Sequence, residues 1–70
     1  MVKLTIENAE KYTLKTIPNC QIISSHKGLY NCAMMEDVDG IEAVKIKFKL
    51  GENVESFLVW IEDGSLYGEW

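Results

Sequence analysis

The chain has 70 residues, of which 47% are hydrophobic and 26% charged, and its formal net charge is −4 at pH 7. This composition is typical of globular chains and excludes the polar, charge-rich sequences that stay disordered. Dividing so few residues would leave two pieces that are each too small to bury a core. We therefore expect a single β domain over residues 1–70.

The distribution of charges argues against export and membrane insertion. Lys3 and Glu7 interrupt the stretch where the apolar core of a signal peptide would begin. Residues 16–26, the longest stretch without a charge, include a proline and several polar residues, and roughly 20 apolar residues are needed to span a bilayer. We expect a cytoplasmic protein with no membrane contact, in which Cys20 and Cys32 are thiols and a disulfide is the less favoured alternative.

The two ends of the chain differ in charge. Residues 1–50 hold seven lysines and six acids, whereas residues 51–70 hold five acids and no base. All seven cations are lysines, so the chain has no guanidinium group to bind phosphate or guanine through two hydrogen bonds. Together with the net negative charge, this argues against specific recognition of nucleic acid.

Three strands are predicted in the C-terminal half. Residues 41–50 alternate between apolar and charged side chains, which predicts a strand with one buried face and one face in water. The apolar positions are Val44, Ile46, Phe48 and Leu50, and the charged ones are Lys45, Lys47 and Lys49. Residues 54–61 predict a central strand, and Asp63–Gly64 predicts a two-residue hairpin loop that joins it to a strand over residues 66–70.

The hairpin loop also predicts the register, with Trp60 opposite Tyr67. A loop of even length around Gly51 would place the apolar positions of the lysine-rich strand beside Phe57, whereas an odd length would place Leu58 and Trp60 there. We favour the even length. One face then carries Phe57, Val59, Ile61, Leu66 and Trp70, and the other carries Lys45, Lys47, Lys49, Leu58, Trp60 and Tyr67.

The N-terminal half gives weaker signals. Alternation in residues 2–6 and 12–16 predicts a hairpin with a polar connection between its strands. A short helix over residues 8–14 is the alternative, because Ala, Glu, Lys and Leu favour a helix while Tyr and Thr do not. Pro18 then breaks either element.

A second hairpin is predicted after this break. Its strands are residues 20–23 and 29–34, and the polar segment Ser24–Gly28 forms its turn. Residues 35–40 are expected to form a loop. Together the segments predict a mostly β fold, a small antiparallel barrel or sandwich of six to seven short strands built from hairpins. The alternative is an α+β fold with one short N-terminal helix.

No metal site is expected. Cys20, His26 and Cys32 provide three zinc ligands, but only an acid such as Asp37 would complete the site, and the spacing matches no CxxC motif. Free cysteines are commonly buried as small apolar residues, which is the simpler interpretation. Calcium is also not expected, because a calcium loop laid on residues 35–46 would have apolar residues at its first and last positions.

Catalysis is not predicted either, and no cofactor is expected. The single histidine, His26, lies in the polar segment 24–28, and its sequence neighbours do not provide the nucleophile, base and orienting group of covalent catalysis. Acids such as Glu42, Glu55 and Glu62 fall at strand ends with no pocket indicated between them. We therefore expect a protein that is not an enzyme.

The lysine-bearing face is the most informative surface that the sequence predicts. Lysines beside aromatic rings are an arrangement that small barrels use to bind single-stranded nucleic acid. Lysine stems also lie commonly along the rings of a half-buried sheet, so the pattern is not specific. An unpaired edge at Tyr67–Trp70 is a further surface for protein binding or for an edge-strand dimer.

The acidic C-terminal third permits another hypothesis, that of an inhibitor that mimics nucleic acid. The acids are few and scatter over two loops and both faces, so solubility is the preferred explanation. They are Glu52, Glu55, Glu62, Asp63 and Glu69.

We expect a small non-enzymatic binding protein that acts stoichiometrically on a macromolecule, preferably a protein. The expected contact residues are Trp60, Tyr67, Lys45, Lys47 and Trp70, because aromatic side chains often anchor interfaces. An adaptor and an inhibitor are equally compatible with the sequence. Single-stranded nucleic-acid binding and nucleic-acid mimicry are the alternatives.

Overall fold

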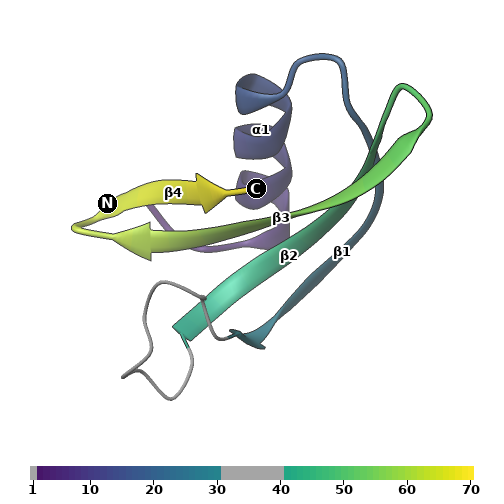
Figure 1. The fold of residues 1–70 in the computed structure, drawn as a ribbon. Helices are drawn as coiled ribbons and strands as arrows, with labels where there is room; N and C mark the ends of the chain where they lie inside the picture. The colour runs from purple at the N-terminus through teal and green to yellow at the C-terminus, as the bar shows by residue number, and fades with distance from the viewer. Residues whose placement is uncertain (1, 31–40) are drawn as a thin grey trace.

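The computed structural model describes residues 2–30 and 41–70, which form one helix and four strands (Figure 1). The elements are α1 (Ile6–Thr16), β1 (Gln21–Tyr30), β2 (Ile41–Leu50), β3 (Asn53–Glu62) and β4 (Ser65–Glu69). The strands form one antiparallel sheet in the order β1-β2-β3-β4, and α1 contacts all four strands from one side. The fold is therefore mostly β, with two layers and an open sheet.

The predicted barrel or sandwich of six to seven strands is wrong, and the α+β alternative describes the fold. Only four strands are present among residues 2–30 and 41–70, and the N-terminal segment expected to form a hairpin is helical. The helix is longer than the predicted alternative of residues 8–14 and spans Ile6–Thr16. No helix in the described ranges has the length and apolar character needed to cross a bilayer.

Local and tertiary interactions explain why α1 forms. Thr5 caps its N-terminus, since the Thr5 Oγ1 accepts a hydrogen bond of 3.0 Å from the Asn8 N–H. Ala9 and Thr13 are fully buried against the sheet, and the Thr13 hydroxyl donates to the Ala9 carbonyl at 2.8 Å. This bond satisfies the hydroxyl, so a residue with weak helix propensity is tolerated in the interior. Pro18 follows directly after the cap residue Ile17 and disfavours continuation.

The second predicted hairpin is also wrong, because residues 21–30 form a single strand. The segment expected to be its turn pairs with β2 throughout, including His26 with Lys45 and Gly28 with Ala43. One irregularity, a bulge at Ile23, interrupts the register. Long-range pairing with β2 outweighs the turn-like composition of the segment. Residues 31–34 of the predicted hairpin and the predicted loop 35–40 lie outside the described residues.

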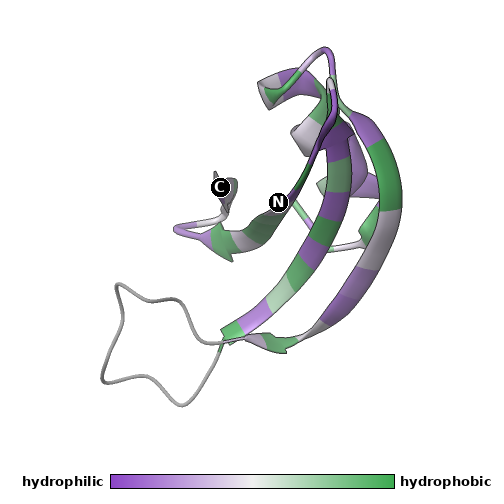
Figure 2. Cartoon of the chain, turned by 45° about the vertical axis from the view of Figure 1, so that its right-hand side comes forward, coloured by the Kyte–Doolittle hydropathy of each residue, from purple (hydrophilic) through white to green (hydrophobic). Residues whose placement is uncertain are grey.

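The predicted register of the three C-terminal strands is confirmed. Leu50 pairs with Asn53, so the loop at Gly51 has two residues, and the positive φ of Gly51 (64°) suits the first position of such a loop. Trp60 pairs with Tyr67 across the second loop. Asp63 and Gly64 there have φ of 53° and 79°, as a type I′ turn requires. Figure 2 shows the resulting alternation of hydrophobic and hydrophilic residues along the strands.

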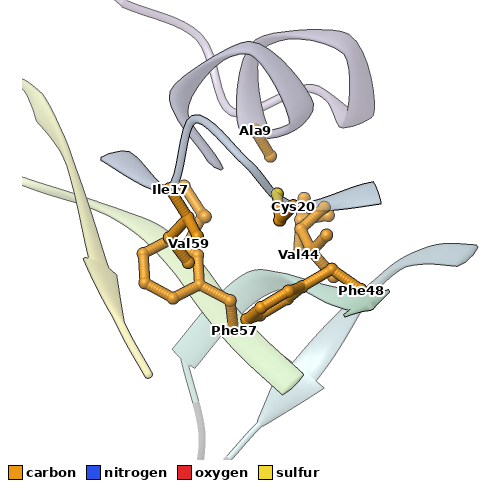
Figure 3. Packing of buried hydrophobic residues seen from close by; sticks show 8 residues of the cluster. Ala9, Ile17, Cys20, Val44, Phe48, Phe57 and Val59 are labelled. Atoms are coloured by element: carbon orange, nitrogen blue, oxygen red, sulfur yellow. The ribbon is translucent and has the colours of Figure 1, made fainter. Parts of the chain in front are cut away.

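The core lies between α1 and the sheet (Figure 3). Its central side chains come from β2 and β3, and Ala9 closes it from above. The buried residues are Ala9, Ile17, Cys20, Val44, Ile46, Phe48, Phe57 and Val59. Each fully buried aliphatic or aromatic side chain contributes about 1.5–3 kcal/mol relative to exposure. The helix face of the sheet is therefore the one that holds the fold together.

A substitution at Gly68 tests this packing. A Cβ at Gly68 would lie 2.7 Å from the Tyr12 Cε1 and closer still to the ring of Phe57, and these two rings stack at 6.2 Å between centroids. We predict that Gly68→Ala lowers the free energy of unfolding by about 1–3 kcal/mol, because the added methyl group must push aside the packed rings of Tyr12 and Phe57. Chemical denaturation measures the change.

Gly28→Ala is the matched control. A Cβ at Gly28 would meet no atom closer than 3.6 Å, which is ordinary van der Waals contact. We expect its stability to stay within about 0.5 kcal/mol of the wild type. Equal losses from the two substitutions would contradict the packing of Tyr12 and Phe57 over Gly68.

Candidate binding face of the sheet

The sheet has a second face, which we call the open face. It consists of the strand residues whose side chains point away from α1, and no other described helix or strand packs on it. Strand pairing places these residues in rows that run across the sheet. Because side chains alternate along each strand, the residues of one row share a face. The open face is thus defined by register.

One row of the open face is aromatic. Gly28, Ala43, Trp60 and Tyr67 pair in succession across the four strands. Two of them are small, which leaves room for large rings beside them. Tyr30, two residues after Gly28 on the same strand, uses that room: its ring lies 3.6 Å from the position of a Cβ at Gly28, and its hydroxyl donates to the His26 carbonyl at 3.3 Å. The ring of Tyr30 thus lies over the Gly28 end of this row, and we call Tyr30, Trp60 and Tyr67 the aromatic row.

Trp60 is the centre of this row. Its side chain is half-buried, and its indole Nε1 is buried with no hydrogen-bond partner among the described residues. Leaving a buried donor unpaired costs about 1–3 kcal/mol. The position of the ring is therefore stabilised by apolar packing and not by its polar atom. Tyr67 beside it is 44% exposed.

A second group on the open face is cationic. Lys45, Lys47 and Lys49 follow one another along β2 at alternate positions, and all three are exposed. Alternate residues of a strand are about 7 Å apart, so the ammonium groups form a band along the middle of the sheet. None of the three forms an ion pair with a described residue. We call them the lysine band; the exposed His26 lies opposite Lys45.

The structure brings together four of the five predicted contact residues. Trp60, Tyr67, Lys45 and Lys47 lie on the open face. Trp70 lies on the helix side, where its ring packs edge-on against Phe48 at 5.4 Å between centroids. Its Nε1 donates to the Glu55 Oε2 at 2.7 Å. Trp70 thus helps to cover the core instead of extending the aromatic row.

Sequence reasoning missed two members of this face, Tyr30 and His26. Both were assigned to a hairpin that does not form, so neither received a register. Had residues 24–28 been recognised as strand, parity alone would have placed His26, Gly28 and Tyr30 together. The polar composition of the segment concealed this signal.

The candidate metal ligands and nucleophiles do not converge among the described residues. Cys20 is buried in the core under α1, whereas His26 is exposed on the open face, so the sheet separates them. Cys32, Asp37 and the calcium-like segment 35–40 lie outside the described residues. Among residues 2–30 and 41–70, no three His, Cys, Asp or Glu side chains are grouped to hold a metal ion. Ser25 points toward the helix and donates to the Glu10 Oε2 at 2.5 Å.

Comparisons of the chain with protein-family models, with curated proteins and with solved structures find no match. The open face, where the aromatic row adjoins the lysine band, is the candidate functional site.

The two tryptophans provide a test of their placement. Trp70→Phe leaves only Trp60, which is half-buried, and Trp60→Phe leaves only Trp70, which is 58% exposed. We predict that acrylamide quenches the fluorescence of Trp70 several times more efficiently than that of Trp60, because collision requires exposure. Stern–Volmer plots of the two folded variants measure this ratio. Equal quenching would contradict the position of Trp60 within the aromatic row.

Proposed function

We propose that this chain is a non-enzymatic binding domain whose open face contacts an acidic surface of a protein partner. The supporting observation is the aromatic row beside a lysine band, on a face that no described element covers. Trp60 and Tyr67 act as anchors, and Lys45 and Lys47 act as charge contacts. An adaptor and a stoichiometric inhibitor would use this face in the same way.

Aromatic residues suit the anchoring role for physical reasons. Trp and Tyr bring a large apolar area to a contact, and they have few rotamers to lose. Trp60 is already held by its neighbours, so little conformational entropy remains to be lost on binding. Truncating such an anchor commonly costs 1 kcal/mol or more of binding free energy, roughly a fivefold loss of affinity.

The lysine band defines the chemistry of the partner. Three exposed ammonium groups without an ion pair among the described residues attract carboxylates. Their contribution is greatest in the rate of association and in the choice of partner. A protein surface with acidic and apolar residues side by side complements both groups of the open face.

Single-stranded nucleic acid is the competing ligand for the same residues. Rings for bases and cations for the backbone are both present. The net charge of −4 opposes long-range attraction to phosphate, and lysines contact phosphate only as point charges. These two facts favour the protein partner.

The test compares partner capture by variants of the full chain. Wild-type protein, Tyr67→Ala and the double variant Lys45→Glu/Lys47→Glu are immobilised and exposed to lysate of the source cells, and captured proteins are quantified by mass spectrometry. We expect partners of the wild type to bind each variant about tenfold more weakly. Circular dichroism verifies that each variant is folded.

Lys27→Glu is the control for a charge reversal away from the open face. Lys27 lies on the helix side and pairs with Glu42 at 3.4 Å, so its reversal changes net charge without touching the open face. We expect less than a twofold effect on capture. If the open-face variants retained every partner of the wild type, the open face would not be the binding surface.

Direct titration with single-stranded DNA separates a protein partner from nucleic acid. A short oligothymidylate titrated into the wild type is expected to show no saturable binding at physiological salt. Tight binding that weakens steeply with salt and is lost in Lys45→Glu/Lys47→Glu would replace the protein partner by nucleic acid.

A further inference from the structure

The two edges of the sheet differ in how they are protected. β1 carries a bulge at Ile23 and a charged side chain at Lys27, two features that discourage pairing with another chain. β4 has no lysine, proline or bulge, and its length of five residues limits how long a strand added to it can be. The edge at β4 is therefore the one whose unpaired backbone N–H and C=O groups can accept a further strand.

The hairpin geometry identifies the backbone groups that are available. A two-residue loop makes Glu62 and Ser65 a hydrogen-bonded pair, and such pairs recur at alternate positions. Trp60 and Tyr67 are thus the next hydrogen-bonded pair, and Leu66 and Gly68 turn their N–H and C=O groups outward. No described residue forms a hydrogen bond with these outward groups.

A groove lies beside this edge. It has a volume of about 700 Å³ and opens between α1, the segment before it and β4. Its lining includes Val2, Lys3, Lys11, Tyr12, Lys15 and Leu66. Leu66 belongs to both features, because its backbone faces out from the edge while its side chain lines the groove. A strand paired with β4 would therefore also contact the groove.

The charge of the groove selects the ligand. Three lysines line it against one acid, Glu7, and Glu7 is already paired with Lys11 at 3.3 Å. Lys3 and Lys15 have no ion pair with a described residue. The groove is cationic although the chain as a whole carries −4. A ligand with carboxylates is the complement of this lining.

We propose that an extended, acidic segment of another protein adds to β4 as a fifth strand. Residues of that segment opposite Leu66 and Gly68 point to the helix side, since paired residues share a face. Apolar side chains there contact Leu66 and Tyr12, and carboxylates two residues further along the segment, which share that face, reach Lys3 and Lys15. Two outward-facing residues supply few main-chain hydrogen bonds, so the groove provides most of the affinity.

A second copy of this chain fits the edge less well. Pairing β4 with β4 of another copy would bring two lysine-lined grooves together, and like charges repel. The acidic partner segment is thus the occupant that the charges favour.

Nuclear magnetic resonance titration tests this proposal. The probe is a capped peptide whose odd positions alternate between Glu and Val and whose even positions are Thr, so that Glu and Val share one face of the strand. It is added to the isotope-labelled full chain, and a peptide with Lys in place of Glu serves for comparison. We expect the Glu peptide to shift the amide signals of Leu66 and Gly68 and to slow their hydrogen exchange. The Lys peptide is expected to bind at least tenfold more weakly.

Charge reversal supplies the matched variants. Lys3→Glu/Lys15→Glu is expected to weaken the Glu peptide about tenfold at low salt, because two attractions become repulsions. Lys27→Glu, on β1 at the opposite edge of the sheet, is the control and is expected to change affinity by less than twofold. If the double variant bound the Lys peptide more tightly than the Glu peptide, this would directly support the groove as the binding site.

Three results would overturn the proposal. One is the absence of any shift at Leu66 and Gly68 at millimolar peptide, and another is a set of shifts confined to Trp60 and Tyr67. The third is a concentration-dependent dimer in sedimentation equilibrium with Leu66 and Gly68 protected without peptide, which would assign the edge to a second copy. The first and third results leave capture through the open face unaffected, and the second would support it, so the two proposals fail independently.

Discussion

The alternation of side chains along β2 is the constraint on which the structure depends. Val44, Ile46 and Phe48 are fully buried under α1, while Lys45, Lys47 and Lys49 point the other way into water. A slip of one residue would expose three core side chains, each stabilising by about 1.5–3 kcal/mol, and would bury three ammonium groups at a greater cost. The register of β2 is therefore fixed, and the lysine band is its direct consequence.

The size of the helix layer determines what remains available for binding. α1 packs through Ala9 (Figure 3) and Thr13, two small side chains that let the helix lie close to the sheet. Among residues 2–30 and 41–70, α1 is the only helix, and it covers only one face of the sheet. The aromatic row and the lysine band lie on the other face. The groove and the β4 edge arise where the helix and the preceding segment lie beside the last strand.

The C-terminal strands were predictable because their signals are local. The period of two in residues 41–50 and the two-residue loops fix both faces and register, so Trp60, Tyr67, Lys45 and Lys47 were grouped correctly. The N-terminal half was not, because α1 depends on burial of Ala9 and Thr13, and β1 depends on pairing with β2. Neither interaction is visible in a short window of sequence. Tyr30 was missed for that reason. Trp70 lies on the helix side, away from the other contact residues, because it is three residues after Tyr67 and side chains alternate between the two faces.

The most direct measurement is the paramagnetic relaxation that a neutral gadolinium chelate in solution causes at individual methyl groups. Three residues of β3 are decisive: Val54 and Leu58 on the open face, and Val59 in the core. We predict strong relaxation for Val54, clear relaxation for Leu58 and almost none for Val59. Equal relaxation of Leu58 and Val59 would contradict a sheet with one face buried under α1 and the other open to a partner.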